Sequence, residues 1–206
     1  MIPIQFITHH TSTLTYEASA MAALEGGCRW IQLRMKEATD EEMKPIALRL
    51  KAACRAVDAT FVIDDRVALV KEIEADGVHL GQNDMPVDEA RQVLGEGFLI
   101  GGTANTIDDI RRLHRASADY IGLGPFRYTT TKEKLSPLLG LEGYRQIMDE
   151  VFRESINVPI CAIGGIEASD VKALMATGID GIAVSGCICR AKSPADAMAA
   201  MLRLDE

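Results

Sequence analysis

Residues 61–84 read FVIDDRVALVKEIEADGVHLGQND, and this stretch decides the fold. Two short apolar runs, 61–63 and 78–80, flank apolar residues at three- and four-residue steps, which is typical of strand, helix and strand. A right-handed crossover makes two such strands parallel neighbours, so their ends lie on one rim of a sheet. The first run ends at Asp64 and Asp65, and the second ends shortly before Asp84. We therefore expect Asp65 and Asp84 at the same rim, where they could share one cation.

Each of these aspartates has an alternative role as a helix cap. An Asp between a strand and a helix commonly accepts hydrogen bonds from the first helical amides. Asp84 fits that role because Pro86 follows it, and proline is common in the first helical turn. However, the carboxylates of Asp64, Asp65 and Asp84 repel one another at adjacent strand ends unless a positive charge lies between them. We therefore favour a metal ion or a cationic ligand over capping.

The composition limits the class of protein. The 206 residues are 48% hydrophobic and 25% charged, which is usual for a globular domain with one sizeable core. The net charge of −8 argues against a nucleic-acid partner or an anionic membrane surface. A few local cations and a metal would still suffice to bind a phosphorylated substrate. We expect small-molecule partners, whereas the oligomeric state cannot be read from the sequence and a homodimer is compatible with it.

The cysteines and the N-terminus predict a cytoplasmic protein. Five scattered cysteines lie mostly within apolar runs, so buried reduced thiols are expected. Cys187 and Cys189 are too close together for a CxxC redox or zinc pair. The opening MIPIQFITHH lacks a basic segment followed by a long apolar one, and no apolar run reaches the ~18 residues of a membrane span.

The strand–helix unit recurs along the whole chain. Eight such units at a spacing of roughly 25 residues match a small (β/α)8 barrel. The expected strands are short and continuously apolar, as parallel strands covered by helices should be. We therefore predict an α/β fold consisting of a single (β/α)8 TIM barrel that forms one domain over residues 1–206. An open doubly wound sheet is the alternative, although no glycine-rich dinucleotide fingerprint follows the first strand.

The carboxyl ends of the predicted strands carry the polar residues of a binding site. The active site of such a barrel lies at these ends. Gln32, Arg34 and Lys36 follow the second strand at period two, so their side chains point to one side. The other strand ends contribute Asp64, Asp65, Gln82, Asp84, Thr103, Gly164, Gly165, Ser185 and Gly186.

Two features of these strand ends predict phosphate binding. The loops at Gly165 and at Ser185–Gly186 can expose backbone N–H groups near helix starts, although glycine also simply permits a tight turn. Arg34, Lys36 and Lys132 beside two carboxylates suit a Mg2+ polyphosphate, although a charged surface loop explains Lys132 alone.

Two further features bear on the chemistry. The long segment 125–141 is typical of a lid or binding loop, and Thr129, Thr130, Thr131 and Lys132 give it hydroxyls and an ammonium group. His79 lies inside a strand, which favours a core histidine over a catalytic base. We find no Ser-His-Asp set, no strand lysine suited to a Schiff base and no zinc-like cluster.

At these residues the sequence resembles the thiamine phosphate synthase (thiamine-phosphate pyrophosphorylase) family over nearly its whole length. The resemblance rests on QLRMK at 32–36, Asp65-Arg66, ADGVHLGQ at 75–82 leading to Asp84, ADYIGLGP at 118–125 followed by Thr129, Thr131 and Lys132, and IGGI at 163–166. The family is a (β/α)8 barrel. It joins 4-amino-2-methyl-5-hydroxymethylpyrimidine diphosphate to a thiazole phosphate and releases diphosphate, so the resemblance implies a transferase of thiamine biosynthesis.

The resemblance also implies a role for each matching position. The pyrimidine diphosphate is held by Gln32, Leu33, Arg34, Met35 and Lys36, with Asp64 and Thr103 nearby. Mg2+ is bound by Asp65 and Asp84. The thiazole substrate meets Thr129, Thr130 and Thr131, and its phosphate is received by Gly165, Ser185 and Gly186. Arg34, Lys36 and Lys132 are the catalytic residues, because they neutralise the charge of the departing diphosphate.

The chain departs from the family pattern in places. Asp64 replaces the family's usual Asn, and an ionised Asp can only accept hydrogen bonds, for example from the pyrimidine amino group. Thr103 replaces Ser and keeps the hydroxyl. Three other functions stay open: the related thiazole tautomerase, a non-catalytic thiazole- or phosphate-binding regulator, and a phosphosugar-type isomerase or aldolase. The paired metal carboxylates and the segment from Thr129 to Lys132 argue against the first. The complete set of cationic and acidic positions argues against the second, and the absence of a strand Lys or Glu argues against the third.

Overall fold

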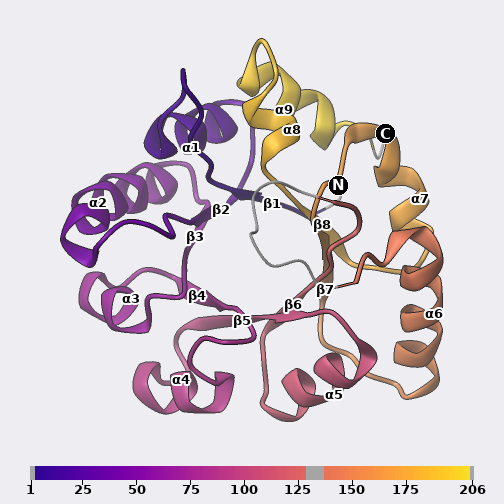
Figure 1. The fold of residues 1–206 in the computed structure, drawn as a ribbon. Coiled ribbons are helices and arrows are strands. Elements are labelled where there is room, and N and C mark those ends of the chain that lie inside the picture. The colour runs from indigo at the N-terminus through magenta and orange to yellow at the C-terminus, as the bar shows by residue number, and fades with distance from the viewer. Residues whose placement is uncertain (1–2, 129–136, 205–206) are drawn as a thin grey trace.

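Eight parallel strands close into a barrel (Figure 1). The computed structural model describes residues 3–128 and 137–204. Each strand pairs with the next in sequence, and the last pairs with the first. The strands are β1 (Ile4–Ile7), β2 (Trp30–Leu33), β3 (Thr60–Asp64), β4 (Gly77–Leu80), β5 (Leu99–Ala104), β6 (Tyr120–Leu123), β7 (Ile160–Ile163) and β8 (Gly181–Val184). The predicted (β/α)8 barrel is confirmed, and the open doubly wound sheet is excluded.

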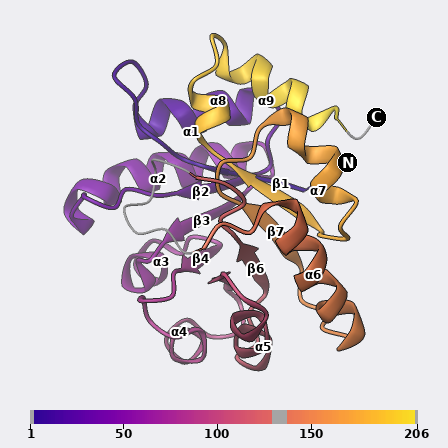
Figure 2. The ribbon, with the colours of Figure 1, turned by 45° about the vertical axis from the view of Figure 1, so that its right-hand side comes forward.

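Helices form a ring around the barrel and cover its outer face (Figures 1 and 2). They are α1 (Tyr16–Glu25), α2 (Asp40–Ala56), α3 (Val67–Ile73), α4 (Val87–Leu94), α5 (Ile107–Arg115), α6 (Gly140–Arg153), the 3-10 helix η1 (Ala168–Asp170), α7 (Val171–Met175), α8 (Gly186–Cys189) and α9 (Pro194–Leu202). No described helix combines the length and the apolar character needed to cross a membrane.

The strand register places the predicted strand ends on one rim. Asp64, the last residue of β3, pairs with His79 of β4. The backbone N–H of Asp65 then donates to the His79 carbonyl at 2.9 Å. The strands are buried almost throughout because they pack between the barrel interior and the surrounding helices. The polar residues that follow them therefore emerge together at the carboxyl end of the barrel.

Local sequence signals fix several helix ends. Thr39 and Glu42 form a capping box, and α2 begins at Asp40, directly after Thr39. Pro45 lies inside this helix and does not delay its start. Thr106 caps α5 in the same way as Thr39 caps α2. His114, near the end of α5, is exposed.

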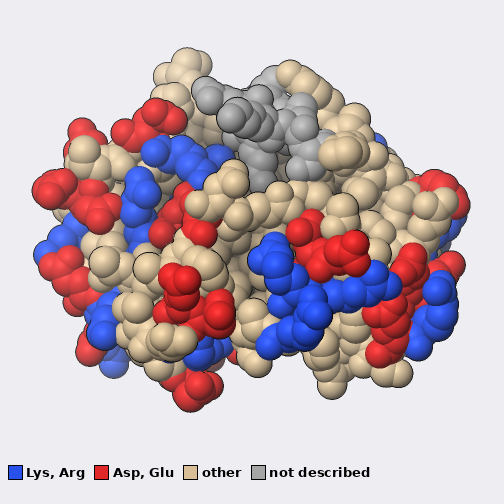
Figure 3. All heavy atoms as spheres, turned by 60° about the horizontal axis from the view of Figure 1, so that its bottom comes forward, with Lys and Arg blue, Asp and Glu red and all other residues tan. Residues whose placement is uncertain are grey.

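Charges of both signs are mixed on the face shown in Figure 3. One cluster links α5 to α6, where Arg111 pairs with Asp108, Glu150 and Glu154. Such exposed pairs contribute little individually to stability. On this face the positive side chains are interspersed with acidic ones.

Candidate active site

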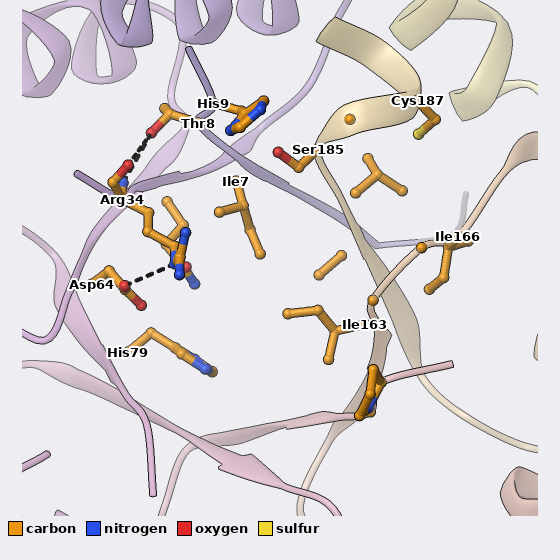
Figure 4. Close-up of a pocket in the computed structure, with 18 of the residues that line it drawn as sticks. Ile7, Thr8, His9, Arg34, Asp64, His79, Ile163, Ile166, Ser185 and Cys187 are labelled. Carbon is orange, nitrogen blue, oxygen red and sulfur yellow. Dashed lines mark hydrogen bonds and ion pairs between the residues drawn. The ribbon is translucent and has the colours of Figure 1, made fainter. Parts of the chain in front are cut away.

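A cavity opens at the carboxyl ends of the strands, and strands from both sides of the barrel line it (Figure 4). Arg34, Asp64 and His79 approach from β2, β3 and β4, and Ile163 and Ser185 face them from β7 and the end of β8. Gln32, Arg34 and Lys36 all line it, as the period-two spacing predicted. One wall of the cavity therefore carries the charged residues of β2 and β3, and the opposite wall is formed by the loops after β7 and β8.

The charged wall holds two cations against two carboxylates. The backbone N–H of Arg34 donates to Thr8 Oγ1 at 2.9 Å, which fixes the chain just beyond β2. Arg34 Nε lies 3.2 Å from Asp64 Oδ2 (Figure 4). Lys36 Nζ lies 3.4 Å from the same oxygen and also contacts Asp65. Because Arg34 uses Nε for this contact, its two terminal nitrogens can bind an anion in the cavity.

Neither proposed metal ligand acts as a helix cap, so the capping alternative is wrong for both. The helix after β3 begins at Val67 without a side-chain cap, and the helix after β4 begins at Val87, also without one. Asp84 Oδ2 instead accepts from the backbone N–H of Gly81 at 2.6 Å. A Cβ at Gly81 would lie 2.7 Å from the same oxygen, so a side chain there would crowd the carboxylate. Asp65 has a positive φ of 66°, a conformation that few residues other than glycine adopt.

The carboxyl groups of Asp65 and Asp84 meet within hydrogen-bonding reach of each other. Burial raises the pKa of Asp65 to about 7, and the neighbouring Asp84 and Asp64 contribute to the increase. Burial opposes the shift at Asp84, but hydrogen bonds from Asp65 and Gly81 lower the pKa of that carboxyl. Two carboxylates this close are stable only with a proton or a cation between them.

This pair fits a divalent ion that is shared with a substrate. Asp65 Oδ1 is buried and has no hydrogen-bond donor within the described chain. In that part of the chain no three His, Cys, Asp or Glu side chains form a metal-binding group. Mg2+ is commonly held by one or two carboxylates, while substrate phosphates and water complete its coordination. An incomplete protein ligand set with an orphaned carboxylate oxygen is consistent with that arrangement.

The opposite wall consists of the loops after β7 and β8. Gly164 and Gly165 have positive φ values of 96° and 70°. A Cβ at Gly164 would lie 2.7 Å from Pro125, and one at Gly165 would collide with Arg127. The backbone conformation and the packing therefore both require glycine here, as the alternative of a tight turn held. Both residues also line the cavity. Helix α8 begins directly after Ser185.

Two further basic side chains line the cavity beside these loops. Arg190 follows α8 and pairs with Glu167 at 2.9 Å. His9 lies beyond β1, and burial lowers its pKa, with further lowering by His10, Arg34 and Arg190. A neutral imidazole and a guanidinium group therefore adjoin the Ser185–Gly186 loop.

Comparison with known proteins decides the family. The sequence model described as thiamine monophosphate synthase matches residues 4–188. The chain belongs to this family. A thiamine-phosphate synthase of Phocaeicola vulgatus is 60% identical over 94% of this chain and 93% of its own length. One of Bacteroides fragilis is 56% identical over 95% of this chain and 96% of its own length.

A solved structure agrees with this family assignment. The thiamine phosphate pyrophosphorylase from Pyrococcus furiosus superposes with a TM-score of 0.87 at 32% sequence identity. The match covers 98% of this chain and 95% of that one. The resemblance noted from the sequence is therefore confirmed at the level of family and fold.

The structure brings together most of the residues that the family resemblance singled out. The cavity is lined by Gln32, Arg34, Lys36, Asp64, Asp65, Thr103, Gly165, Ser185 and Gly186. Asp84 adjoins Asp65 and lines a small neighbouring cavity. The side chains of Leu33 and Met35 are instead buried in the hydrophobic core and do not line the cavity. Thr129, Thr130, Thr131 and Lys132 lie outside the described residues.

Sequence reasoning missed part of the thiamine monophosphate synthase site. Arg190 was not singled out, although its position one helical turn beyond Ser185–Gly186 was an available signal. His9 follows the first strand without a recognisable motif, so the sequence gives only a weak signal for it. Ile163 and Cys187 also line the cavity; Ile163 belongs to the IGGI motif but was given no role of its own, and Cys187 lies in α8 without a distinctive pattern.

Proposed function

We propose that this chain is a thiamine-phosphate synthase, a transferase of thiamine biosynthesis. It would transfer the 4-amino-2-methylpyrimidin-5-ylmethyl group from its diphosphate to the nitrogen of a thiazole phosphate in a Mg2+-dependent reaction. Thiamine phosphate and diphosphate are the products. Family membership and relatives at 56–60% identity support the activity. The metal and the residue roles rest on the site geometry.

One observation carries the assignment of roles. Asp65 and Asp84, from neighbouring strand ends, meet beside Arg34 and Lys36 at the mouth of the barrel. A site with two carboxylates and two cations suits a metal–diphosphate group, because the metal takes the carboxylate oxygens and the cations take the phosphate oxygens.

The reaction breaks the bond between the pyrimidine methylene carbon and the diphosphate oxygen. The electron pair leaves with the diphosphate, so negative charge grows on the leaving group. Arg34 and Lys36 donate hydrogen bonds to its oxygens, and we assign Lys132 the same role. Mg2+ bound at Asp65 and Asp84 would add positive charge at the leaving group. The step needs no general base, which agrees with the lack of a recognisable one in the sequence.

The thiazole nitrogen then forms a bond to the methylene carbon with its own lone pair. We place the thiazole phosphate at Gly165, Ser185 and Gly186, on the wall opposite the carboxylates. Arg190 and His9 lie beside these loops and would donate to the phosphate oxygens. We assign contacts with the thiazole itself to Thr129, Thr130 and Thr131.

We propose a cytoplasmic location and small-molecule partners. The five cysteines in the described chain are free thiols, as expected in a reducing compartment. A homodimer is compatible with this assignment, and the site as described is formed by one chain.

Diphosphate release and thiamine phosphate formation test the function. Purified protein would receive Mg2+, the pyrimidine diphosphate and the thiazole phosphate. We expect release only with both substrates, and loss of it in Asp84→Ala. Asp88→Ala is the matched control, because Asp88 is an exposed acid on the adjacent helix. No product from folded wild-type protein that still binds the ligands would refute the synthase assignment and favour the tautomerase or the binding protein.

A further inference from the structure

A chain of hydrogen bonds crosses the barrel interior below the cavity. Gln32 Nε2 donates to Gln5 Oε1, and Gln5 Nε2 donates to the Tyr120 hydroxyl, each at 3.2 Å. The hydroxyl lies 3.1 Å from His79 Nδ1, and His79 Nε2 lies 3.0 Å from Thr103 Oγ1. All five residues are buried, and each comes from a different strand. Its two ends, Gln32 and Thr103, line the cavity, whereas Gln5 and Tyr120 do not.

We propose that Tyr120 is a positioning residue that sets the direction of this chain, so that Gln32 offers a carbonyl oxygen and Thr103 a hydroxyl proton to the substrate. The proposal deepens the function proposed above and rests on it for the identity of the substrate.

The direction follows from counting donors. The Tyr120 hydroxyl lies 3.2 Å from Gln5 Nε2 and 3.1 Å from His79 Nδ1, and the Gln32 amide adjoins it on the same side as Gln5. Gln5 Nε2 can only donate, so the hydroxyl oxygen accepts from it. The single hydroxyl proton then goes to His79 Nδ1, which must be unprotonated. Burial raises the pKa of Tyr120, so the hydroxyl keeps this proton.

The remaining links are then determined. An imidazole with a bare Nδ1 carries its proton on Nε2, so His79 donates to Thr103 Oγ1. The Thr103 proton is therefore available to an acceptor in the cavity. At the other end, Gln32 uses an Nε2 proton on Gln5 and turns its carbonyl oxygen away from it. Reversing the direction would require both amides to rotate and would place the imidazole proton on Nδ1.

The packing around Tyr120 holds its hydroxyl in place. The Trp30 ring meets the Tyr120 ring edge-on, with centroids 4.8 Å apart. Gly101 on β5 lies directly against the Tyr120 ring, and any Cβ there would collide with it. Gly122 leaves room for the His79 ring, because a Cβ added at Gly122 would lie 3.2 Å from His79 Cε1.

The resulting polarity suits an aminopyrimidine. Its amino group donates and the adjacent ring nitrogen accepts. A carbonyl oxygen at Gln32 would receive the amino group, and the Thr103 hydroxyl would donate to the ring nitrogen. The opposite direction of the chain would present a donor to the amino group and leave a buried polar pair unsatisfied.

The tautomer of His79 gives the first test, and it needs no substrate. Nitrogen-15 NMR distinguishes an imidazole protonated on Nε2 from one protonated on Nδ1. The chain has four histidines, and the His79 signals are those missing from the spectrum of His79→Gln. We expect the proton on Nε2. A proton on Nδ1 would show that the chain runs the other way and would overturn the proposal.

Tyr120→Phe gives the second test, because it keeps the ring and removes the hydroxyl. We expect the Nδ1 signal of His79 to shift and the Kd of the pyrimidine diphosphate to rise about tenfold, since buried partners lose their hydrogen bonds. The Kd of inorganic diphosphate with Mg2+ should stay unchanged, because that ligand meets Arg34 and Lys36 instead. Equal weakening of both ligands, or of neither, would overturn the positioning role.

Tyr144→Phe is the matched control. Tyr144 is equally buried, and its hydroxyl bonds to the Leu123 carbonyl outside the chain of hydrogen bonds. Its substitution should leave the His79 signals unchanged, and a change equal to that of Tyr120→Phe would count against the proposal. If wild type made no thiamine phosphate yet His79 carried its proton on Nε2, the proposed function would fail while the direction of the chain stood.

Discussion

Asp64 is where the charged wall of this site differs from the pattern that the family resemblance predicts. Its carboxylate lies 3.2 Å from Arg34 Nε and 3.4 Å from Lys36 Nζ, and its side chain is only 8% exposed. The contact at Nε orients the guanidinium so that its terminal nitrogens remain for the diphosphate. Asp64 therefore orients Arg34, in addition to the substrate contact expected from the sequence.

Substitution of Asp64 should separate these two tasks. Asp64→Asn keeps an oxygen of the same shape beside Arg34 Nε, so we expect the KM for the pyrimidine diphosphate to stay within about threefold of wild type. Asp64→Ala removes the side chain that faces Arg34 and should raise that KM about tenfold, which corresponds to about 1.4 kcal/mol. Steady-state kinetics with saturating thiazole phosphate measures both. An equal increase in the two variants would mean that the negative charge, and not the orientation of Arg34, matters.

Sequence patterns located the residues whose spacing reflects backbone geometry. The period-two series Gln32, Arg34 and Lys36 and the strand-terminal Asp65 and Asp84 meet at one rim because strand direction and register are fixed by the fold. Arg190 and Tyr120 were not found as site residues. Their roles depend on which side chains the closed barrel brings within reach, and that information is not local in the sequence.

At the scale of elements, the start of α5 is tied to the rim through Asp109. Its carboxylate accepts from the backbone N–H groups of Asn105 and Thr106 at 3.0 and 3.1 Å and from Gln82 Nε2 at 2.9 Å. Burial opposes the shift, but hydrogen bonds from Asn105, Thr106 and Arg112 lower the pKa of Asp109 below its ordinary value of 3.8. A carboxyl whose pKa is lowered by folding stabilises the fold above its unfolded pKa and loses that effect as the pH falls through the folded one.

We therefore expect Asp109→Ala to lower the free energy of unfolding by about 2 kcal/mol at pH 7, the upper range for a helix cap. The difference from wild type should shrink as the pH falls below about 4. Urea unfolding at several pH values measures it. Asp108→Ala is the control, since Asp108 is 84% exposed and pairs only with Arg111 among the described residues, so its effect should be smaller. A difference that stays constant down to the lowest pH at which wild type is folded would contradict the prediction.

Elements with strong local signals were predicted best. The capping boxes at Thr39 and Thr106 mark the starts of α2 and α5. The apolar run predicts a strand over 98–101. Strand β5 continues three residues further, to Ala104, because its glycines pair with β6. The sequence pattern predicts one helix over 169–177, whereas the structure has a 3-10 turn followed by a five-residue α-helix. The pattern predicts no element over 142–153, where α6 packs through Tyr144, Met148 and Val151.

At the scale of the whole molecule, closure of the barrel joins the first strand to the last. The pairing of β1 with β8 makes the rim continuous, so the charged wall and the wall formed by the loops after β7 and β8 lie on one closed sheet. The repeat of strand and helix predicted this closure, since eight units complete a barrel. Any ligand that spans the mouth and binds only the folded state should then stabilise the entire chain.

Thermal unfolding with inorganic diphosphate and Mg2+ tests this coupling together with the proposed metal site. At about 100 times its Kd, a ligand adds about 2.7 kcal/mol, which is roughly 5–10 °C in Tm for a domain of this size. We expect the shift only when both are present, because Asp65 and Asp84 alone form an incomplete ligand set for the metal.

Asp65→Asn should abolish the Mg2+-dependent part of this shift while preserving the fold. Asparagine tolerates the left-handed conformation that Asp65 adopts, with φ of 66°, but it lacks the charge that attracts the metal. Asp88→Ala should keep the full shift, since Asp88 is exposed on α4. An equal shift by diphosphate in the presence of a chelator would mean that Arg34 and Lys36 bind the anion without a metal, and the roles assigned to the two aspartates would then be wrong.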